Sequence, residues 1–236
     1  MICRPVFTEN EQLTWKQLFE NQTPLRKTQI IPEFSDGLES LGITSNQIPD
    51  LDSVNERLKR MTGWQGIFVK GFESPSTFYE MLSEKKFPIG SFIRDSKDLS
   101  YTPEPDIFHD LYGHIPFYTI PEYGDFCQDF GQRGLHYLKS EKITEEFQRL
   151  FWFTIEFGLL KTSAGLKIFG AGIASSFGEC AYALSDQPVK KKFDIEEIRN
   201  KSFRIDLMQK ELFVIENMNQ LYQCLDDFER IYKNEP

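Results

Sequence analysis

The chain is poor in the residues that build many metal and disulfide sites. Its 236 residues include three histidines and four cysteines, and the cysteines are scattered with no C-x-x-C pair. This spacing predicts neither a zinc cluster nor a disulfide framework. Reduced thiols are typical of a cytosolic protein, so we expect a cytoplasmic location.

Long apolar runs and basic stripes are lacking as well. No window approaches the roughly 18 uninterrupted apolar residues of a membrane span, and the amino-terminal stretch has no apolar core of signal-peptide length. The formal net charge is −9, and no stripe of Lys or Arg is present. A nucleic-acid binder usually carries a basic face. We therefore expect neither a membrane nor a nucleic acid as partner.

What the chain does have is a large apolar and aromatic content. Hydrophobic residues make up 40% of the chain and 22 residues are phenylalanine, which suits one domain with an aromatic core. Helical patterns are expected near residues 9–21, 32–41, 50–61, 74–86, 123–138, 144–160 and 175–184, and through the last third to about 232. Short strands are expected near 66–72, 87–94 and 165–172. Because these elements do not alternate regularly, we expect a mainly α fold with small β-ribbons, in a single domain over residues 1–236.

Two of the three histidines, His109 and His114, lie five positions apart in PEPDIFHDLYGHIPFY. On an ideal α-helix, five positions leave two side chains roughly 140° apart, too far to meet at one metal ion. Gly113 predicts a helix end at which a left-handed glycine folds the chain back. Both imidazoles would then reach one point. Two partly buried histidines bonded to backbone groups are the alternative.

A third candidate ligand is Glu156, the one charge in the apolar stretch FWFTIEFGLL. A buried carboxylate needs an arginine, a proton or a cation as partner, because burying it alone is costly. Two imidazoles and one carboxylate around a metal with open positions form the facial triad of non-haem iron(II) oxygenases. The same ligand types also suit a catalytic zinc ion, although the H-E-x-x-H pattern is absent.

Two aspartates, Asp106 and Asp110, flank His109 in the sequence. A ligating histidine usually donates its second ring N–H to a carboxylate or a carbonyl group. Asp106 is the better candidate for this acceptor because residues three or four apart are neighbours on a helix. An N-cap role for Asp106 is the alternative and is compatible with the first role.

Three motifs now combine into a resemblance. TPEPDIFHDLYGHIPF, WFTIEFGL and KIFGAGIASSFGE occur in this order and resemble the catalytic domain of the pterin-dependent aromatic amino acid hydroxylases, most of all the bacterial phenylalanine 4-hydroxylases. The resemblance is strongest over residues 66–185. It implies Fe(II) ligated by His109, His114 and Glu156, with tetrahydrobiopterin or a related reduced pterin as cosubstrate and dioxygen as oxidant.

The activity implied by the resemblance is monooxygenation of the ring of L-phenylalanine to give L-tyrosine. The resemblance also implies that Trp152 stands in the wall of the ring pocket, where its bulk would favour a single ring over an indole. The same chemistry on L-tryptophan or L-tyrosine is the alternative, because apolar pockets discriminate by only about 1–3 kcal/mol per group. A non-catalytic descendant that binds an amino acid is a further alternative.

The resemblance also implies two sets of binding residues. Arg94 would clamp the amino-acid carboxylate, a task that suits the guanidinium fork, with a surface ion pair as its alternative. The other implied substrate-binding residues are Thr102, Trp152, Phe157, Gly172 and Ser175. The implied pterin-binding residues are Phe78, Asp110 and Phe151, while Asp106 and Glu179 would support the site from behind.

Assembly follows from the same resemblance. We expect no regulatory domain and no heptad helix for tetramer assembly. The expected state is a monomer, or at most a weak dimer, whose partners are an aromatic amino acid and a pterin.

Overall fold

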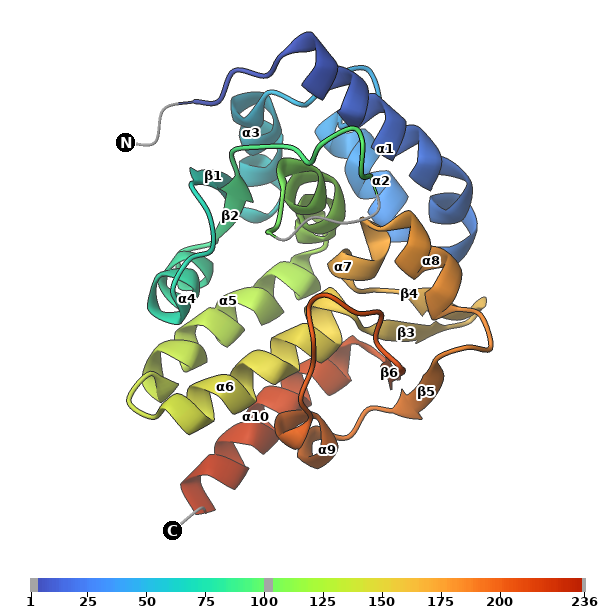
Figure 1. The fold of residues 1–236 in the computed structure, drawn as a ribbon. Coiled ribbons are helices and arrows are strands. Elements are labelled where there is room, and N and C mark those ends of the chain that lie inside the picture. Colours follow the sequence, from blue (N-terminus) through green and yellow to red (C-terminus); the bar gives the residue numbers. More distant parts are fainter. Residues whose placement is uncertain (1–3, 100–103, 235–236) are drawn as a thin grey trace.

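Helices form the frame of the computed structural model, which describes residues 4–99 and 104–234 (Figure 1). The α-helices are α1 (Glu9–Gln29), α2 (Pro32–Leu41), α3 (Leu51–Thr62), α4 (Pro75–Ser83), α5 (Pro121–Tyr137), α6 (Glu141–Phe151), α7 (Ala171–Ala174), α8 (Phe177–Ala183), α9 (Ile195–Asn200) and α10 (Met218–Asn234). Three further helical segments are η1 (Phe108–His114), η2 (Ile115–Thr119) and η3 (Trp152–Glu156). None of the described helices is long and apolar enough to span a membrane.

The strands form two small sheets. In the first, β1 (Gln65–Val69) and β2 (Lys86–Gly90) pair in parallel, with α4 as the crossover that parallel strands require. The second has the order β4-β3-β6-β5 and contains β3 (Leu159–Thr162), β4 (Gly165–Ile168), β5 (Val189–Lys192) and β6 (Glu211–Ile215). The predicted mainly α fold is confirmed, whereas the helical pattern expected through the last third missed strands β5 and β6.

Two helix boundaries differ from the predicted ones. The expected helix over 144–160 is divided into α6, η3 and the first residues of β3. The helix expected to end near residue 21 continues through Pro24 to Gln29. The helix starts at a capping box: the Thr8 hydroxyl accepts the Glu11 N–H, and the Glu11 carboxylate accepts the Thr8 N–H.

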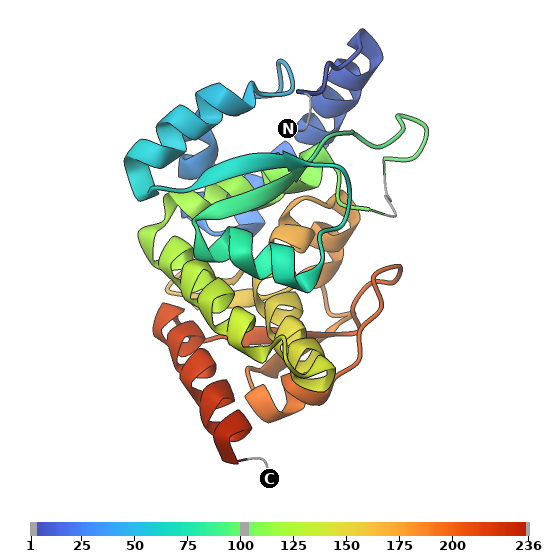
Figure 2. The ribbon, with the colours of Figure 1, turned by 90° about the vertical axis from the view of Figure 1, so that its left-hand side faces the viewer.

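The chain is arranged in two helical halves with the segment after β2 between them. Helices α5, α6 and α10 lie side by side in one half, and α1, α2 and α3 lie in the other (Figures 1 and 2). Segment η2 contacts α2, α3 and α5, and η1 contacts α7 and β2. Segment η3 contacts α6, α7 and β6, so both π-helical segments, η1 and η3, are packed against elements of the surrounding fold.

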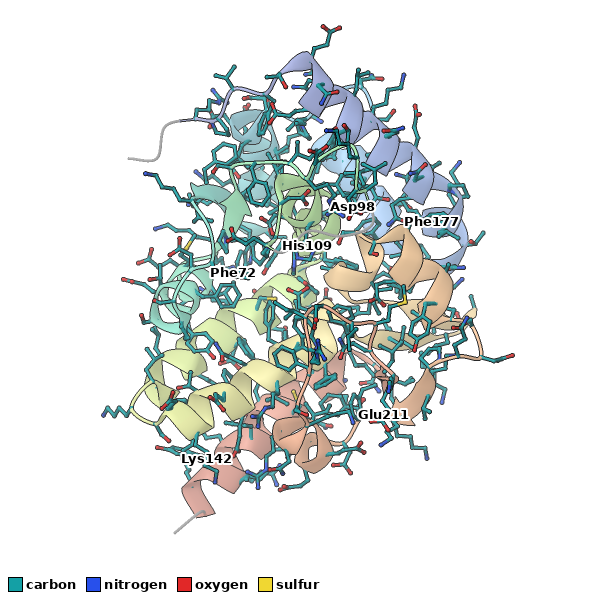
Figure 3. The ribbon with its side chains drawn as sticks, viewed as in Figure 1. Phe72, Asp98, His109, Lys142, Phe177 and Glu211 are labelled. Carbon is teal, nitrogen blue, oxygen red and sulfur yellow. The ribbon has the colours of Figure 1, made fainter. Side chains whose placement is uncertain are left out.

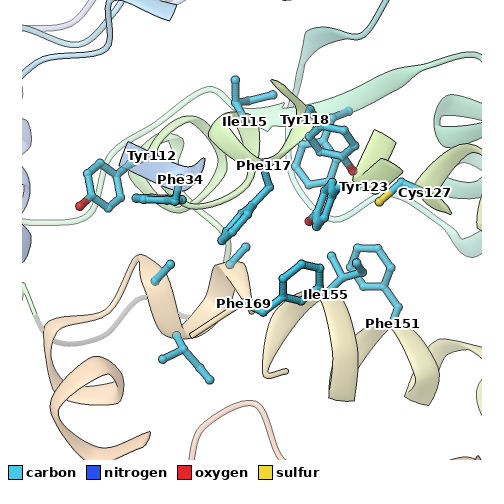
Figure 4. Packing of buried hydrophobic residues seen from close by; sticks show 14 of the residues in the cluster. Phe34, Tyr112, Ile115, Phe117, Tyr118, Tyr123, Cys127, Phe151, Ile155 and Phe169 are labelled. Atoms are coloured by element: carbon cyan, nitrogen blue, oxygen red, sulfur yellow. The ribbon is translucent and has the colours of Figure 1, made fainter. Parts of the chain in front are cut away.

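Aromatic packing fixes this region. The rings of Phe117, Tyr123 and Phe169 are fully buried, and their centroids lie 5.4–5.8 Å apart. Figure 4 shows them facing one another beside Ile155 of η3. Aromatic pairs at such spacings add stability beyond the area that they bury, so the packing that joins η2, α5 and the end of β4 also holds η3 in place.

Candidate metal centre

The two histidines meet because η1 is a π-helix. In a π-helix each carbonyl accepts the N–H group five residues later, as in the bond from the Ile115 N–H to the Asp110 carbonyl. His109 and His114, five residues apart, therefore lie about one turn apart on the same face. The predicted left-handed turn at Gly113 was wrong, since Gly113 is not among the described residues with positive φ. Gly113 instead permits a close approach: a Cβ atom there would lie 2.9 Å from the Ala171 carbonyl oxygen.

A second π-helical segment brings the third ligand. In η3 the Phe157 N–H donates to the Trp152 carbonyl at 2.9 Å. Glu156, at the end of this segment, places Oε1 3.0 Å from His114 Nε2 and Oε2 3.7 Å from His109 Nε2. The two imidazole Nε2 atoms are 3.2 Å apart.

These distances fit one metal ion. Ligand atoms about 2.1 Å from a metal and at right angles to one another lie about 3 Å apart. The separations of 3.0 and 3.2 Å match this value, and the third, 3.7 Å, involves the other oxygen of Glu156. All the candidate ligand atoms lie within 4.8 Å of one another. Two imidazole nitrogens and one carboxylate oxygen are the donor set of the iron(II) facial triad, so the residues present fit iron.

The protonation of the three groups suits a cation. Burial lowers the pKa of His109 to about 4, which keeps its imidazole in the neutral form that binds metals. Burial alone would raise the pKa of Glu156, but the neighbouring His114 and His109 hold it below its ordinary value. Among the described residues, the ion-pair partners of Glu156 are these two histidines and no arginine.

Ser175, and not Asp106, contacts the second nitrogen of the His109 ring. The Ser175 hydroxyl lies 2.9 Å from His109 Nδ1. Asp106 accepts the backbone N–H of His109 at 2.9 Å, so its capping role is confirmed and its predicted role at the ring was wrong. The physical reason is that Arg94 and backbone N–H groups already occupy both oxygens of Asp106.

Arg94 and Asp106 form a buried, bidentate pair. Arg94 Nε and Nη2 donate to the two Asp106 oxygens at 2.8 and 2.9 Å, and the Arg94 backbone N–H adds a bond of 2.9 Å. Burial would raise the pKa of Asp106, but Arg94 holds it below the ordinary value. The side chain of Arg94 is 7% exposed, which rules out its interpretation as a surface ion pair.

Two cavities meet at the triad, near the middle of the molecule where Figure 3 labels His109 and Phe72. The Arg94 cavity has a volume of about 260 Å³, and the Asp110 cavity has a volume of about 200 Å³. Both are lined by His109 and Glu156, together with Phe72 and Pro105. A metal ion on the triad would therefore lie in the shared wall of both cavities.

The Arg94 cavity gathers most of the residues predicted to bind substrate. Its wall includes Arg94, Trp152, Phe157, Gly172 and Ser175. The rings of Trp152 and Phe157 lie 4.6 Å apart at 35°. A Cβ atom at Gly172 would lie 3.1 Å from Glu156 Oε2, so glycine keeps the space beside this ligand open.

The predictions for Thr102 and Glu179 differ from those for the residues above. Thr102 lies outside the described residues. Glu179 was expected behind the site, but it lies in the wall of the Arg94 cavity itself, and burial raises its pKa to about 7.

The Asp110 cavity contains two of the three residues predicted to bind pterin. Phe78 and Asp110 line it, and the Asp110 carboxyl accepts the Gly90 N–H at 2.6 Å. Burial raises the pKa of Asp110 well above its ordinary value. Phe151 does not line this cavity, because it lies behind Phe78 with the two rings perpendicular at 5.2 Å.

Several residues of the walls were not predicted from the sequence, among them Phe72 and Gln148. Phe72 lines both cavities and is 65% exposed, and Gln148 of α6 lines the Asp110 cavity. A polar residue one turn before the WFTIEFGL motif was the available signal for Gln148. Phe72 stands in a short segment with no motif of its own.

Comparison with known proteins shows the family. The model of the biopterin-dependent aromatic amino acid hydroxylases matches residues 1–235. The chain belongs to this family. The resemblance predicted from the three motifs is thereby confirmed.

Individual members of the family are similar over almost the whole chain. The phenylalanine-4-hydroxylase of Caulobacter vibrioides is 40% identical over 229 residues, covering 96% of this chain and 78% of that protein. The phenylalanine hydroxylase structure from Legionella pneumophila has a TM-score of 0.88 and 40% identity, covering 96% and 92%. A Chromobacterium violaceum phenylalanine hydroxylase structure with bound iron(III) and 7,8-dihydrobiopterin has a TM-score of 0.90 and 35% identity, covering 98% and 85%.

Proposed function

We propose that this chain is an iron- and tetrahydropterin-dependent monooxygenase that converts L-phenylalanine to L-tyrosine with dioxygen. The observation that carries the proposal is the triad of His109, His114 and Glu156 between two cavities, in a member of the biopterin-dependent hydroxylase family. One oxygen atom of dioxygen is inserted into a ring C–H bond, and two electrons from the pterin reduce the other oxygen atom.

The residues of the chain divide the work. His109, His114 and Glu156 would hold the iron, and the iron and pterin, when bound, supply the activation of dioxygen. Ser175 fixes the His109 ring through the hydrogen bond at Nδ1, as groups behind metal ligands commonly do. Asp106 supports the same ligand through its backbone N–H.

The Arg94 cavity is the proposed amino-acid site. Arg94 is held in one orientation by Asp106, so its remaining N–H groups are preorganised for a carboxylate. Trp152 and Phe157 would contact the ring, and Gly172 leaves room beside Glu156. Thr102 is proposed from the family resemblance alone.

The Asp110 cavity is the proposed pterin site. Phe78 offers a ring for stacking and Asp110 offers a carboxyl group in the same wall. The Asp110 carboxyl accepts the Gly90 N–H at 2.6 Å, which fixes its orientation in this wall. Phe151 supports Phe78 from behind and would not touch the pterin directly.

We further propose a single catalytic domain that acts as a cytoplasmic monomer. The family model covers residues 1–235. Cys127, Cys180 and Cys224 are free and buried, which suits a reducing compartment. Light scattering on the purified protein would measure the mass in solution, and a mass of two or more chains would contradict the monomer.

The function is tested by aerobic turnover of Fe(II)-loaded protein with a tetrahydropterin and an equimolar mixture of phenylalanine, tyrosine and tryptophan. We expect tyrosine as the main product, formed only with iron and pterin present and lost in Glu156→Ala. Hydroxytryptophan or dihydroxyphenylalanine as main product would overturn the substrate assignment. Absence of iron binding would overturn the triad.

A further inference from the structure

Glu179 is a carboxylate whose bonding is incomplete. It lies on α8, where its backbone N–H donates to the Ser176 hydroxyl at 3.3 Å. Its Oε2 atom is buried and has no hydrogen-bond partner among the described residues. Glu179 as a whole is half-buried, but a buried carboxylate oxygen without a partner is unfavourable, so the missing partner of Oε2 needs an explanation.

The position of Glu179 limits what this partner can be. Glu179 lines the Arg94 cavity and also a neighbouring cavity of about 440 Å³. Among the described residues, Arg94 is the one Lys or Arg in the wall of the Arg94 cavity. The hydrogen bonds of Arg94 go to Asp106 and to the Leu99 carbonyl. Apart from a proton, a cation that pairs with Glu179 would therefore come from a ligand.

The other carboxylates of this wall have different roles. Glu156 belongs to the metal triad, and Glu104 has contacts of its own. The wall thus presents one guanidinium, one incompletely bonded carboxylate and the aromatic rings of Phe72, Trp152 and Phe157. An aromatic amino acid carries the three matching groups: a carboxylate, an ammonium and a ring.

We propose that Glu179 binds the α-ammonium group of the amino-acid substrate, while Arg94 binds its carboxylate. This inference rests on the proposed function. The contact makes Glu179 a specificity-determining residue, because it favours a zwitterion over an arylalkanoate of the same shape. An arylalkanoate has no ammonium group, so the Glu179 carboxylate would stay unpaired in the same cavity as a second anion. Placing like charges close together is unfavourable.

Three ligands separate this role from a structural one. L-phenylalanine has both charges, 3-phenylpropanoate lacks the ammonium, and 2-phenylethylamine lacks the carboxylate. Their affinities for the Fe(II)-loaded protein would be measured by calorimetry without pterin and without oxygen, so that no turnover occurs. The variant is Glu179→Gln, and the charge-matched control is Glu39→Gln, which removes an exposed carboxylate on α2.

The expected result has opposite signs for different ligands. In Glu179→Gln we expect phenylalanine and phenylethylamine to bind at least about tenfold more weakly, because removal of one partner of a buried charge pair is costly. We expect 3-phenylpropanoate to bind equally or more tightly, since a repulsion is removed. Glu39→Gln should leave all three affinities unchanged.

Two outcomes would overturn the inference. Weakening of all three ligands by the same factor would show that Glu179 only maintains the shape of the site. Unchanged affinity for phenylalanine would show that its ammonium is bound elsewhere. Failure of the proposed function is distinguishable, because the unmodified, iron-loaded protein would then neither bind phenylalanine nor produce tyrosine.

Discussion

Two carboxylates near the Arg94 cavity, Asp106 and Glu179, differ in their hydrogen bonds and in the direction of their pKa shifts. Asp106 is fully buried, receives hydrogen bonds from Arg94 and two backbone N–H groups, and has a lowered pKa. Glu179 leaves one buried oxygen without a partner and has a raised pKa. The difference separates a charge whose partners are supplied by the fold from one whose partner would be supplied by a ligand.

The largest expected effect on stability comes from breaking the buried pair of Arg94 and Asp106. Asp106→Asn leaves the Arg94 guanidinium buried without its counter-charge, and removal of one partner of a buried pair typically costs about 3–5 kcal/mol. We expect the free energy of unfolding, measured by urea denaturation of the metal-free protein, to fall by that amount. A loss under about 1 kcal/mol would mean that water or another group replaces the carboxylate.

The next effect concerns the ring contact that the sequence did not assign. Ser175→Ala removes the group 2.9 Å from His109 Nδ1, and loss of such a contact typically costs 10–100-fold in metal affinity. We expect Fe(II) affinity to fall by about that factor in a chelator competition. Ser176→Ala is the matched control, since its hydroxyl caps α8; equal iron affinity in both variants would contradict the role of Ser175.

A smaller effect, of opposite sign, is expected for the incompletely bonded carboxylate. The folded-state pKa of Glu179, about 7, lies above the ordinary value of 4.5. Its favourable contribution is therefore complete below about pH 4.5 and is lost as the pH rises through about 7. At about pH 8 we expect ligand-free Glu179→Gln to be more stable than the unmodified protein by on the order of 1 kcal/mol.

Thermal unfolding at several pH values tests this sign. The stabilisation by Glu179→Gln should disappear at about pH 4, where the unmodified side chain is protonated in both states. A variant that is less stable than the unmodified protein at about pH 8 would show that Glu179 is already well paired in the free protein.

The same contrast explains what the sequence could predict. The ligand types, their order and the family were predictable, because His109, His114 and Glu156 stand in motifs whose residue types limit the chemistry. The helix start at Thr8 was also predictable, since a capping box is a local pattern. These features depend on neighbours in the sequence.

The rest depended on contacts between distant segments. The π-helical form of η1 arises where Gly113 packs against α7, and no local pattern distinguishes it from a helix that ends at glycine. The choice between Asp106 and Ser175 at the His109 ring was likewise made by a residue 66 positions away. Strand β5 was missed because its sequence, VKKK, has no apolar strand pattern, and β6 is placed by pairing with β3, about 55 positions earlier in the chain.

The smallest expected effect uses the same chemical change on the surface. Arg133 of α5 donates to Asp226 of α10 at 2.7 Å, as short as the bond between Arg94 and Asp106, but the Asp226 side chain is 63% exposed. Asp129 and Glu229 also bind Arg133, so Asp226→Asn leaves its charge compensated and hydrated. Exposed pairs typically contribute about 0–1 kcal/mol, and we expect urea denaturation to show a loss of about 0.5 kcal/mol or less. A loss near that of Asp106→Asn would mean that burial is not what distinguishes the two arginine clusters.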